Sequence, residues 1–340
     1  MEDAMLLDRI GMRVPVVQAP MAGVTTPRLA AAVANAGGLG SLGVAALDAA
    51  KAGEEVRQTR ALTAARFNVN VFCHRPPRRD AAKEAAWLAA LAPDFARFGG
   101  AAPEGLEDGY RPFALDPEML AMLLAERPGV VSFHFGLPPA DQIAALRESG
   151  AVLLGSATCR QDAERIVAAG LDGIVAQGWQ AGGHRGLFDE NGPDERLQTL
   201  DLLRALKGVG LPLIAAGAIM SRGDVQAVLA AGAVAAQCGT AFLMAEEAGT
   251  SPAHRAALAP GATRMTRAIS GRPARGVDNI ISRRDDRAAP DYPLPYSALK
   301  ALHALASKAG EDGYGPFWAG TGCAEARPGT AAEILRRLAP

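Results

Sequence analysis

Short runs of apolar and β-branched residues alternate along the chain with longer alanine-rich stretches of helical character. Each run is followed by Gly, Pro, Ser or a polar residue, where the chain must turn. This alternation is typical of βα units around a parallel sheet. Eight runs predict strands: Val14–Gln18, Leu39–Leu42, Phe67–Val71, Val130–Phe133, Ala151–Gly155, Gly173–Gln177, Pro212–Ala215 and Ala233–Gln237. Eight is the strand number of a TIM barrel, so we expect an α/β protein with a (β/α)8 fold.

Helix boundary signals lie between these runs. Thr26 precedes Pro27, the order expected of an N-cap followed by proline at the first helical position. The segment Ser221–Ala231 begins with an N-cap serine, carries Asp224 three residues later and is followed by Gly232. It is the clearest predicted helix of the chain.

Two regions do not fit the repeating unit. Residues 76–128 are longer than one crossover helix, and their composition predicts two helices and a loop inserted after strand three. We expect this insertion to shield one side of the active site. After Gln237 the periodic pattern ends, and an arginine-rich stretch follows at Arg264–Arg287. We therefore expect residues 1–250 to form the barrel and residues 251–340 a C-terminal cap over it.

Composition and charge limit the function. The chain has 340 residues, of which 49% are hydrophobic, so it can bury a large core. Its 35 Lys and Arg residues are balanced by 36 Asp and Glu residues, so no positive field draws it to nucleic acid or to a membrane. We expect a small-molecule partner. The N-terminus resembles no signal peptide, and no run of about 18 apolar residues follows, which favours a cytoplasmic protein.

The cysteines predict neither a disulfide framework nor a metal site. Cys73, Cys159, Cys238 and Cys323 are widely spaced, without a Cys-x-x-Cys pair. We expect reduced thiols with structural roles and no bound metal.

One glycine pattern invites a dinucleotide interpretation. Gly38–Gly43 matches G-x-G-x-x-G, but that fingerprint must follow a strand and open a helix, and here the predicted helix Leu29–Ala36 comes before it. Close packing of the second strand explains these glycines better.

Two loops suit a phosphate group. In barrel enzymes phosphate often binds after strands seven and eight, where backbone N–H groups converge. Ala216–Ile219 follows strand seven, and Gln237–Thr240 follows strand eight. Their small residues let a phosphate approach the backbone, and the Thr240 hydroxyl can donate to it. Tight turns alone would explain one such loop more easily than both.

Other strand ends suit a flavin ring. Gln18–Gly23 forms an apolar platform after strand one, while Asn70 and Gln177 end strands three and six with amides. A buried amide needs a hydrogen-bond partner, and a polar heterocycle is one such partner. Each amide taken alone is more often a core residue that is satisfied within the protein.

Two histidines stand at strand ends. His184 follows Gly182 and Gly183 in the loop after strand six, where an imidazole can exchange a proton near neutral pH. A surface-loop histidine is an equally good explanation of its position. His134 ends strand four and can face the same cavity, although a packing role fits its spacing better.

The remaining histidines and two arginines carry weaker signals. His74, His254 and His303 lie in Arg-rich or Ala-rich contexts, and we expect surface or packing roles for them. Arg272 and Arg275 are candidates for neutralising a phosphate or an anionic substrate, but such clusters usually form solvated ion pairs.

Taken together, these motifs resemble the class I nitronate monooxygenases, from about Val14 to Lys300. The Ala-Gly-Gly-His element is shared with flavin enoyl-reductases and quinone reductases, whereas the bulky Ser132–Gly136 separates the monooxygenases from them. The segments that carry the resemblance are Gln18–Gly23, Asn68–Phe72, Ser132–Gly136, Gln177–Gly186 and Gln237–Leu243.

The resemblance implies roles for individual residues. His184 would be the catalytic base, with His134, Tyr296 and Lys300 in the substrate pocket. The cofactor FMN would contact Met21, Ala22, Asn70, Gln177, Gly182, Gly217, Ala218, Gln237, Cys238, Gly239 and Thr240. The chain departs from the family pattern at Gln180, where Glu is usual, and at Ala218 and Asn68, where Gly is found. The methyl group of Ala218 makes its phosphate contact the least secure.

The activity implied is the FMN-dependent oxidation of an alkyl nitronate, such as propionate 3-nitronate, by dioxygen to a carbonyl compound and nitrite. His184 would act as a base only for neutral nitroalkanes, because a nitronate arrives already deprotonated. The alternatives are an NAD(P)H-dependent reductase of quinones or enoyl thioesters, and a non-catalytic flavin-binding protein. We expect a monomer or a homodimer.

Overall fold

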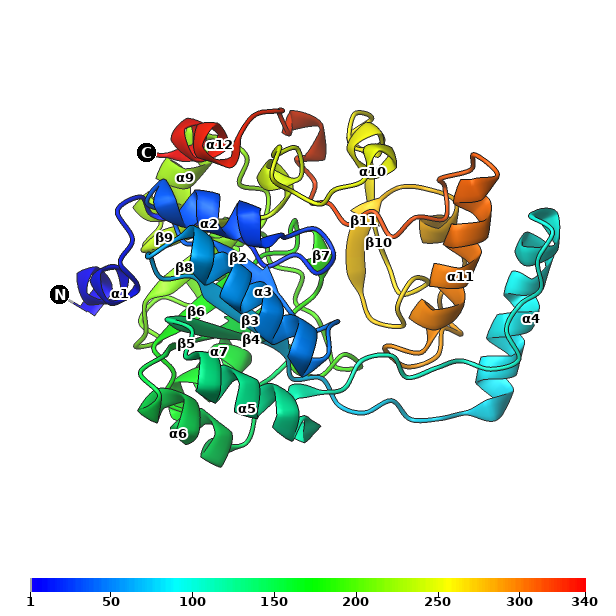
Figure 1. The fold of residues 1–340 in the computed structure, drawn as a ribbon, viewed down its shortest axis with the longest axis horizontal. Helices are drawn as coiled ribbons and strands as arrows, with labels where there is room; N and C mark the ends of the chain where they lie inside the picture. The colour runs from blue at the N-terminus through cyan, green and yellow to red at the C-terminus, as the bar shows by residue number, and fades with distance from the viewer. Residues whose placement is uncertain (1) are drawn as a thin grey trace.

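Eight parallel strands form the barrel of the computed structural model, which describes residues 2–340 (Figure 1). In sheet order they are β1 (Val16–Gln18), β9 (Ala235–Cys238), β8 (Leu213–Ala216), β6 (Gly173–Gln177), β5 (Val152–Ala157), β4 (Val130–His134), β3 (Asn68–Phe72) and β2 (Ser41–Gly43). Leu39, just before β2, closes the ring through a parallel bridge to Val17 and a hydrogen bond from the Gln18 N–H to its carbonyl (2.9 Å). The predicted (β/α)8 fold is confirmed.

Eight helices surround this sheet. They are α2 (Pro27–Asn35), α3 (Ala49–Leu62), α5 (Pro117–Glu126), α6 (Ala140–Glu148), α7 (Arg160–Ala168), α8 (Thr199–Ala205), α9 (Arg222–Ala230) and α12 (Ala331–Leu338). The capping residues predicted from the sequence begin two of these helices. The Thr26 hydroxyl accepts from the Leu29 N–H, and Ser221 and Asp224 form a capping box on α9. α12 comes from the end of the chain and packs between α2 and α9.

A second lobe covers the carboxyl ends of the strands, on the right in Figure 1. Its helices α4 (Ala81–Arg97) and α11 (Pro295–Lys308) pack together through Trp87, Leu91 and Leu302. The inserted residues 76–128 thus supply α4 to this lobe and α5 to the barrel. The remaining elements beside the barrel are α10 (Pro252–Ala257) and an antiparallel sheet of β10 (Thr263–Thr266), β11 (Ala274–Val277) and β7 (Gly183–His184).

Short elements complete the chain. α1 (Glu2–Ile10) covers the amino-terminal end of the barrel, where Leu6 and Ile10 share a cluster with strand residues such as Leu154. The 3-10 turns are η1 (Phe113–Leu115), η2 (Thr240–Phe242), η3 (Ile281–Arg283) and η4 (Cys323–Glu325).

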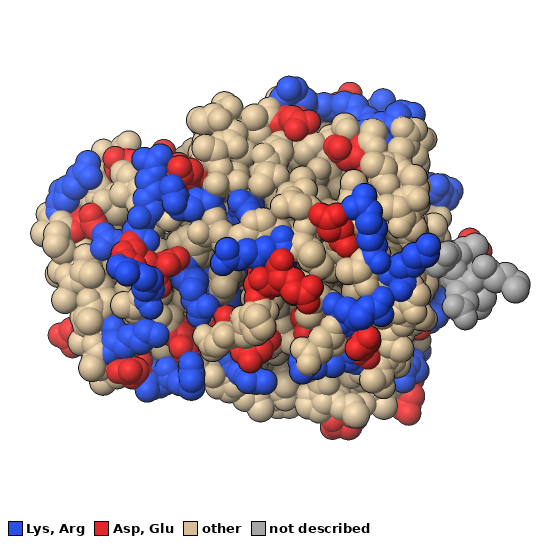
Figure 2. Space-filling view, turned by 180° about the vertical axis from the view of Figure 1, so that it is seen from behind, with Lys and Arg blue, Asp and Glu red and all other residues tan. Residues whose placement is uncertain are grey.

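Positive and negative side chains are interspersed on the face seen in Figure 2, without a broad area of one sign. Such a surface gives no long-range attraction to a polyanion. None of the helices within residues 2–340 has both the length and the hydropathy needed to cross a bilayer.

Candidate active site

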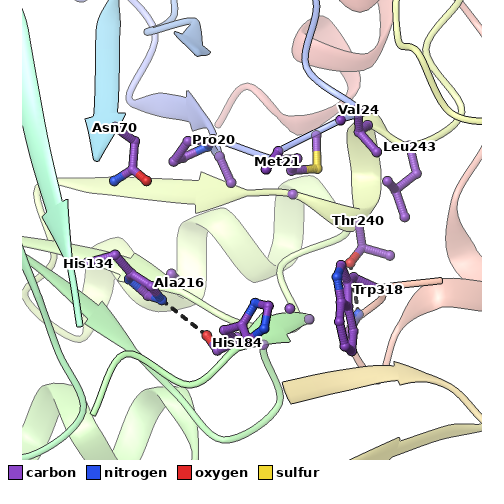
Figure 3. Close-up of a pocket in the computed structure, with 18 of the residues that line it drawn as sticks. Pro20, Met21, Val24, Asn70, His134, His184, Ala216, Thr240, Leu243 and Trp318 are labelled. Atoms are coloured by element: carbon purple, nitrogen blue, oxygen red, sulfur yellow. Dashed lines mark hydrogen bonds between the residues drawn. The ribbon is translucent and has the colours of Figure 1, made fainter. Parts of the chain in front are cut away.

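A cavity of about 500 Å³ lies at the carboxyl ends of the barrel strands, beneath the second lobe. Every residue that the family resemblance assigns to the site lines it: Met21, Ala22, Asn70, His134, Gln177, Gly182, His184, Gly217, Ala218, Gln237, Cys238, Gly239, Thr240, Tyr296 and Lys300. Their individual roles stay predictions. Figure 3 shows the strand-one platform at Pro20 and Met21 facing His134 and His184 across the cavity.

Two backbone loops form a cradle for a phosphate. The N–H groups of Gly217, Ala218, Gly239 and Thr240 line the cavity and donate to no acceptor within the described part of the chain. The Thr240 hydroxyl accepts from the Gly320 N–H (2.9 Å), so its own proton remains available. Backbone N–H groups that line one cavity and have no acceptor within the protein fit an anion. A phosphate-bearing cofactor therefore fits this end of the cavity.

Ala218 adopts a left-handed conformation in this cradle, with φ of +53° after Gly217 at +125°. This conformation costs an L-residue about 1 kcal/mol, whereas glycine adopts it without that cost. We expect Ala218→Gly to leave the free energy of unfolding unchanged or to raise it by up to about 1 kcal/mol. The exposed Ala227→Gly, inside α9, should lose about 1 kcal/mol. Urea unfolding of both variants tests this, and equal losses would contradict it.

The platform and Asn70 present a flat surface and an amide to the cavity. Ala19, Pro20 and Met21 line the cavity along the chain after β1. The Asn70 Nδ2 donates to the carbonyl (3.1 Å) and hydroxyl (2.8 Å) oxygens of Ser132, which leaves its carbonyl oxygen without a partner in the described structure. A heterocycle with an N–H edge fits this arrangement.

Gln177 holds the loop that carries His184. Its Nε2 donates to the His184 carbonyl (2.9 Å), and its Oε1 accepts from the Gly186 N–H (2.8 Å). The buried Arg185 binds both carboxylate oxygens of Asp194 (2.9 and 3.0 Å) and the Gln177 carbonyl (2.8 Å). The Gln177 amide is thus used mainly within the protein.

His184 stands in an aromatic enclosure. Its Nε2 lies 2.9 Å from the Ser270 hydroxyl, and its ring lies 5.7 Å from Phe135, 5.5 Å from Tyr292 and 5.0 Å from Trp318. Burial, and after it the charges of neighbouring groups including His134, lowers the pKa of His184 to about 3. The imidazole is therefore neutral at physiological pH.

His134 is neutral for the same reason. Burial lowers its pKa to about 4, against a smaller opposing effect of its hydrogen bond. Its Nε2 donates to the His184 carbonyl (3.2 Å, dashed in Figure 3), because a carbonyl can only accept. Two strand-end histidines are thus joined, one through its ring and the other through its backbone.

These lowered pKa values predict a stability that depends on pH. The unfolded histidines titrate near pH 6.5 and the folded ones near 3 and 4, so below pH 6.5 the unfolded chain binds more protons. Between pH 6.5 and 5 we expect a loss of about 2 kcal/mol per histidine, and no contribution above this window. Urea unfolding at pH 5 and 7.5 measures it. His184→Asn should reduce the difference in the free energy of unfolding between the two pH values. An undiminished difference would show that folding does not lower the pKa of His184.

Among the described residues that line the cavity, Lys300 alone supplies a full positive charge. Its Nζ lies 4.8 Å from the ring centre of Tyr110 and 5.2 Å from that of Tyr296. Desolvation lowers the pKa of its ammonium group. Among the described residues that line the cavity there is no other Lys or Arg, and no Asp or Glu. The cavity is therefore suited to an anion.

The structure corrects two interpretations. Arg272 and Arg275 do not line the cavity. Arg272 is buried against Glu190 (3.1 Å), and Arg275 donates to the Trp179 carbonyl (3.0 Å). Neither is placed to neutralise a ligand. His254 and His303, expected at the surface or in packing, pack against Phe317, and both also line the cavity.

Sequence reasoning missed several residues of the site. Tyr110, Ser270, Tyr292 and Trp318 surround the predicted residues, but they lie in segments without regular periodicity. The Tyr-Pro-Leu-Pro-Tyr motif was a usable signal for Tyr292, since its second tyrosine is Tyr296. No local sequence pattern indicated Tyr110, Ser270 or Trp318.

A barrel with a phosphate cradle, a flat platform and a neutral histidine at its strand ends defines a class of cofactor-dependent barrel enzymes. The sequence model of the family described as "Nitronate monooxygenase" matches residues 3–340. The chain belongs to this family, and it is an oxidoreductase that acts on nitronates. The family is flavin-dependent in general.

Relatives are similar to this chain along nearly its whole length. A protein named nitronate monooxygenase from Paraburkholderia phytofirmans is 52% identical, over 98% of this chain and 93% of its own. Another of that name from Pseudomonas aeruginosa is 48% identical, over 97% and 96%. A solved nitroalkane oxidase from Streptomyces ansochromogenes is 40% identical with a TM-score of 0.91, over 98% and 96%. FabK from Thermotoga maritima, at 24% identity and a TM-score of 0.74, shares the fold.

Proposed function

We propose that this chain oxidises alkyl nitronates such as propionate 3-nitronate, using FMN and dioxygen, to a carbonyl compound and nitrite. The observation that carries the proposal is the charge of the cavity, in which Lys300 is joined by neutral histidines and by no carboxylate of the described chain. An anionic nitronate matches one unpaired cation, whereas a carboxylate would repel it.

The residues present fit FMN. The unpaired N–H groups of Gly217, Ala218, Gly239 and Thr240 would hold its phosphate. Met21 and Ala22 would lie against the ring, with Asn70 at its edge, and Gln177, Gly182, Gln237 and Cys238 would complete the walls. When bound, FMN supplies the acceptor for electrons from the nitronate and passes them to dioxygen.

The histidines have separate tasks in this proposal. His134 and Lys300 hold the charged head of the substrate. The Ser270 hydroxyl can accept the Nε2 proton of His184, because it reaches the Arg272 carbonyl (3.3 Å) with its own hydrogen. Nδ1 of His184 is then the basic atom. It removes the α-proton from a neutral nitroalkane, and toward a preformed nitronate it only positions the substrate.

We propose that the protein acts as a monomer, or as a homodimer in which each subunit is active by itself. Activity per protein should then stay constant on dilution across any monomer–dimer transition that gel filtration detects. Activity that disappears with the dimer would refute this.

The test uses the purified protein loaded with FMN. The protein should take up oxygen and release nitrite with propionate 3-nitronate, and NADH should not bleach the flavin in the absence of oxygen. Rapid bleaching by NADH, without nitrite from any nitronate, would replace the proposal by a reductase. If His184→Ala retains FMN and full turnover of both the nitronate and the neutral nitroalkane, the histidine has no part in the reaction.

A further inference from the structure

Trp318 is a large side chain of the cavity to which the proposed reaction assigns no task. It belongs to the segment Gly315–Gly322, which runs from the small sheet across to the barrel loops. Figure 3 shows its indole between His184 and Leu243, below Thr240. The ring centre lies 5.0 Å from that of His184.

The backbone on either side of Trp318 is held by elements of both lobes. The barrel binds it at two points, the small sheet at two and α10 at one. The hydrogen bonds are Gly320 N to Thr240 Oγ1 (2.9 Å), Thr321 N to the Gln180 carbonyl (3.1 Å), Val277 N to the Phe317 carbonyl (2.8 Å), Ala319 N to the Arg275 carbonyl (3.3 Å) and His254 Nε2 to the Trp318 carbonyl (3.1 Å). The backbone of Trp318 therefore has little freedom to move away from the barrel loops.

The packing beneath this segment is equally close. A Cβ atom on Gly182 would lie 2.5 Å from the Ala319 carbonyl carbon, and one on Gly320 would lie 2.9 Å from the Gln180 carbonyl oxygen. Two backbone segments are thus in direct contact, one carrying His184 and the other Trp318. The distance between the two backbone segments is therefore set by contacts that cannot relax cheaply.

Trp318 also differs from the other rings around His184. Phe135 and Tyr292 are each 2% exposed, and of these two only Tyr292 lines the cavity. Trp318 keeps an intermediate exposure and lines the cavity. It is therefore the most exposed of the three rings around His184, so a ligand beside His184 can contact it.

We propose that Trp318 determines the length of the alkyl chain that the cavity accepts, as a fixed wall that restricts it to short nitronates. This inference rests on the proposed function. With the charged head at Lys300 and His134, the carbon chain lies near His184 and ends against the indole. A rigid apolar wall discriminates between chains that differ by one methylene by roughly ten-fold or more.

The test compares nitronates prepared from nitroethane, 1-nitrobutane and 1-nitrohexane. Trp318→Ala should raise the ratio of kcat/KM for the six-carbon to the two-carbon nitronate at least ten-fold, and Trp318→Phe should raise it by a smaller factor. FMN content should stay near that of the unaltered protein, and the two-carbon turnover of each variant is the reference for its ratio. Trp87→Phe, in the core of the second lobe, is the control and should leave the ratio unchanged.

An unchanged ratio in Trp318→Ala with FMN retained would overturn the inference. Loss of FMN from both Trp318 variants would also overturn it, because the indole would then be a cofactor contact. If the unaltered protein does not turn over the two-carbon nitronate, the proposed function itself is wrong, and this result is separate from the behaviour of the Trp318 variants. If Trp318→Ala does not fold, the smaller change of ratio in Trp318→Phe decides.

Discussion

His184→Asn is expected to separate two reactions of the cavity. For a neutral nitroalkane, kcat/KM should fall by roughly 10²–10⁴-fold, because the amide cannot remove the α-proton. For a preformed nitronate the fall should be about ten-fold or less, the effect of one altered polar contact. Initial rates of oxygen uptake with nitroethane and with its nitronate give both numbers.

The matched control for this prediction is Ser270→Ala. It removes the 2.9 Å partner of the His184 Nε2 without removing the imidazole. It should weaken the nitroalkane reaction less than His184→Asn does, since the base remains but is held less firmly. Equal losses on nitroalkane and nitronate in His184→Asn would show that the histidine is not the base.

Arg272→Met is expected to destabilise the protein by about 3–5 kcal/mol, the usual result of breaking a buried ion pair from one side. Its guanidinium binds Glu190 (3.1 Å) and the Leu187 carbonyl, and it lies 4.0 Å above the Phe135 ring. Removal leaves the half-buried Glu190 carboxylate without its partner. Urea unfolding at pH 7.5 measures the loss.

Two further variants show whether this loss comes from the uncompensated charge. Arg272→Met combined with Glu190→Gln should recover part of the stability, because no unpaired charge then remains. Arg287→Met breaks an ion pair at an arginine that is 88% exposed, and it should cost no more than about 1 kcal/mol. A loss in Arg272→Met as small as that in Arg287→Met would refute the prediction.

Arg272 also helps to keep the histidines of the site neutral. Arg272 is among the charges that lower the pKa of His74, His134 and His184, after burial itself. Its own pKa is lowered to about 10 by burial, so it stays charged at neutral pH. We therefore interpret it as part of the support behind the histidines, which is a different role from the phosphate contact that its position in the sequence suggested.

Local sequence patterns were sufficient to predict the barrel. The eight strands and the caps of α2 and α9 depend on residues a few positions apart, so periodicity and capping chemistry reveal them. The two phosphate loops follow from a rule about strand ends, and His134 and His184 from their place after strands. The motifs then predicted the family, and with it a flavin and a nitronate.

Tertiary structure alone decided the surroundings of these residues. Ser270 lies 86 positions from His184, and Arg272 lies 82 from Glu190, so no local pattern joins either pair. Likewise α12 returns to complete the helical ring, and Trp318 is placed beside His184 by bonds to both lobes. The sequence by itself determined the elements and the groups at their ends, because these depend on neighbours along the chain. The enclosure that makes the histidines neutral and limits the substrate depends on packing between distant segments.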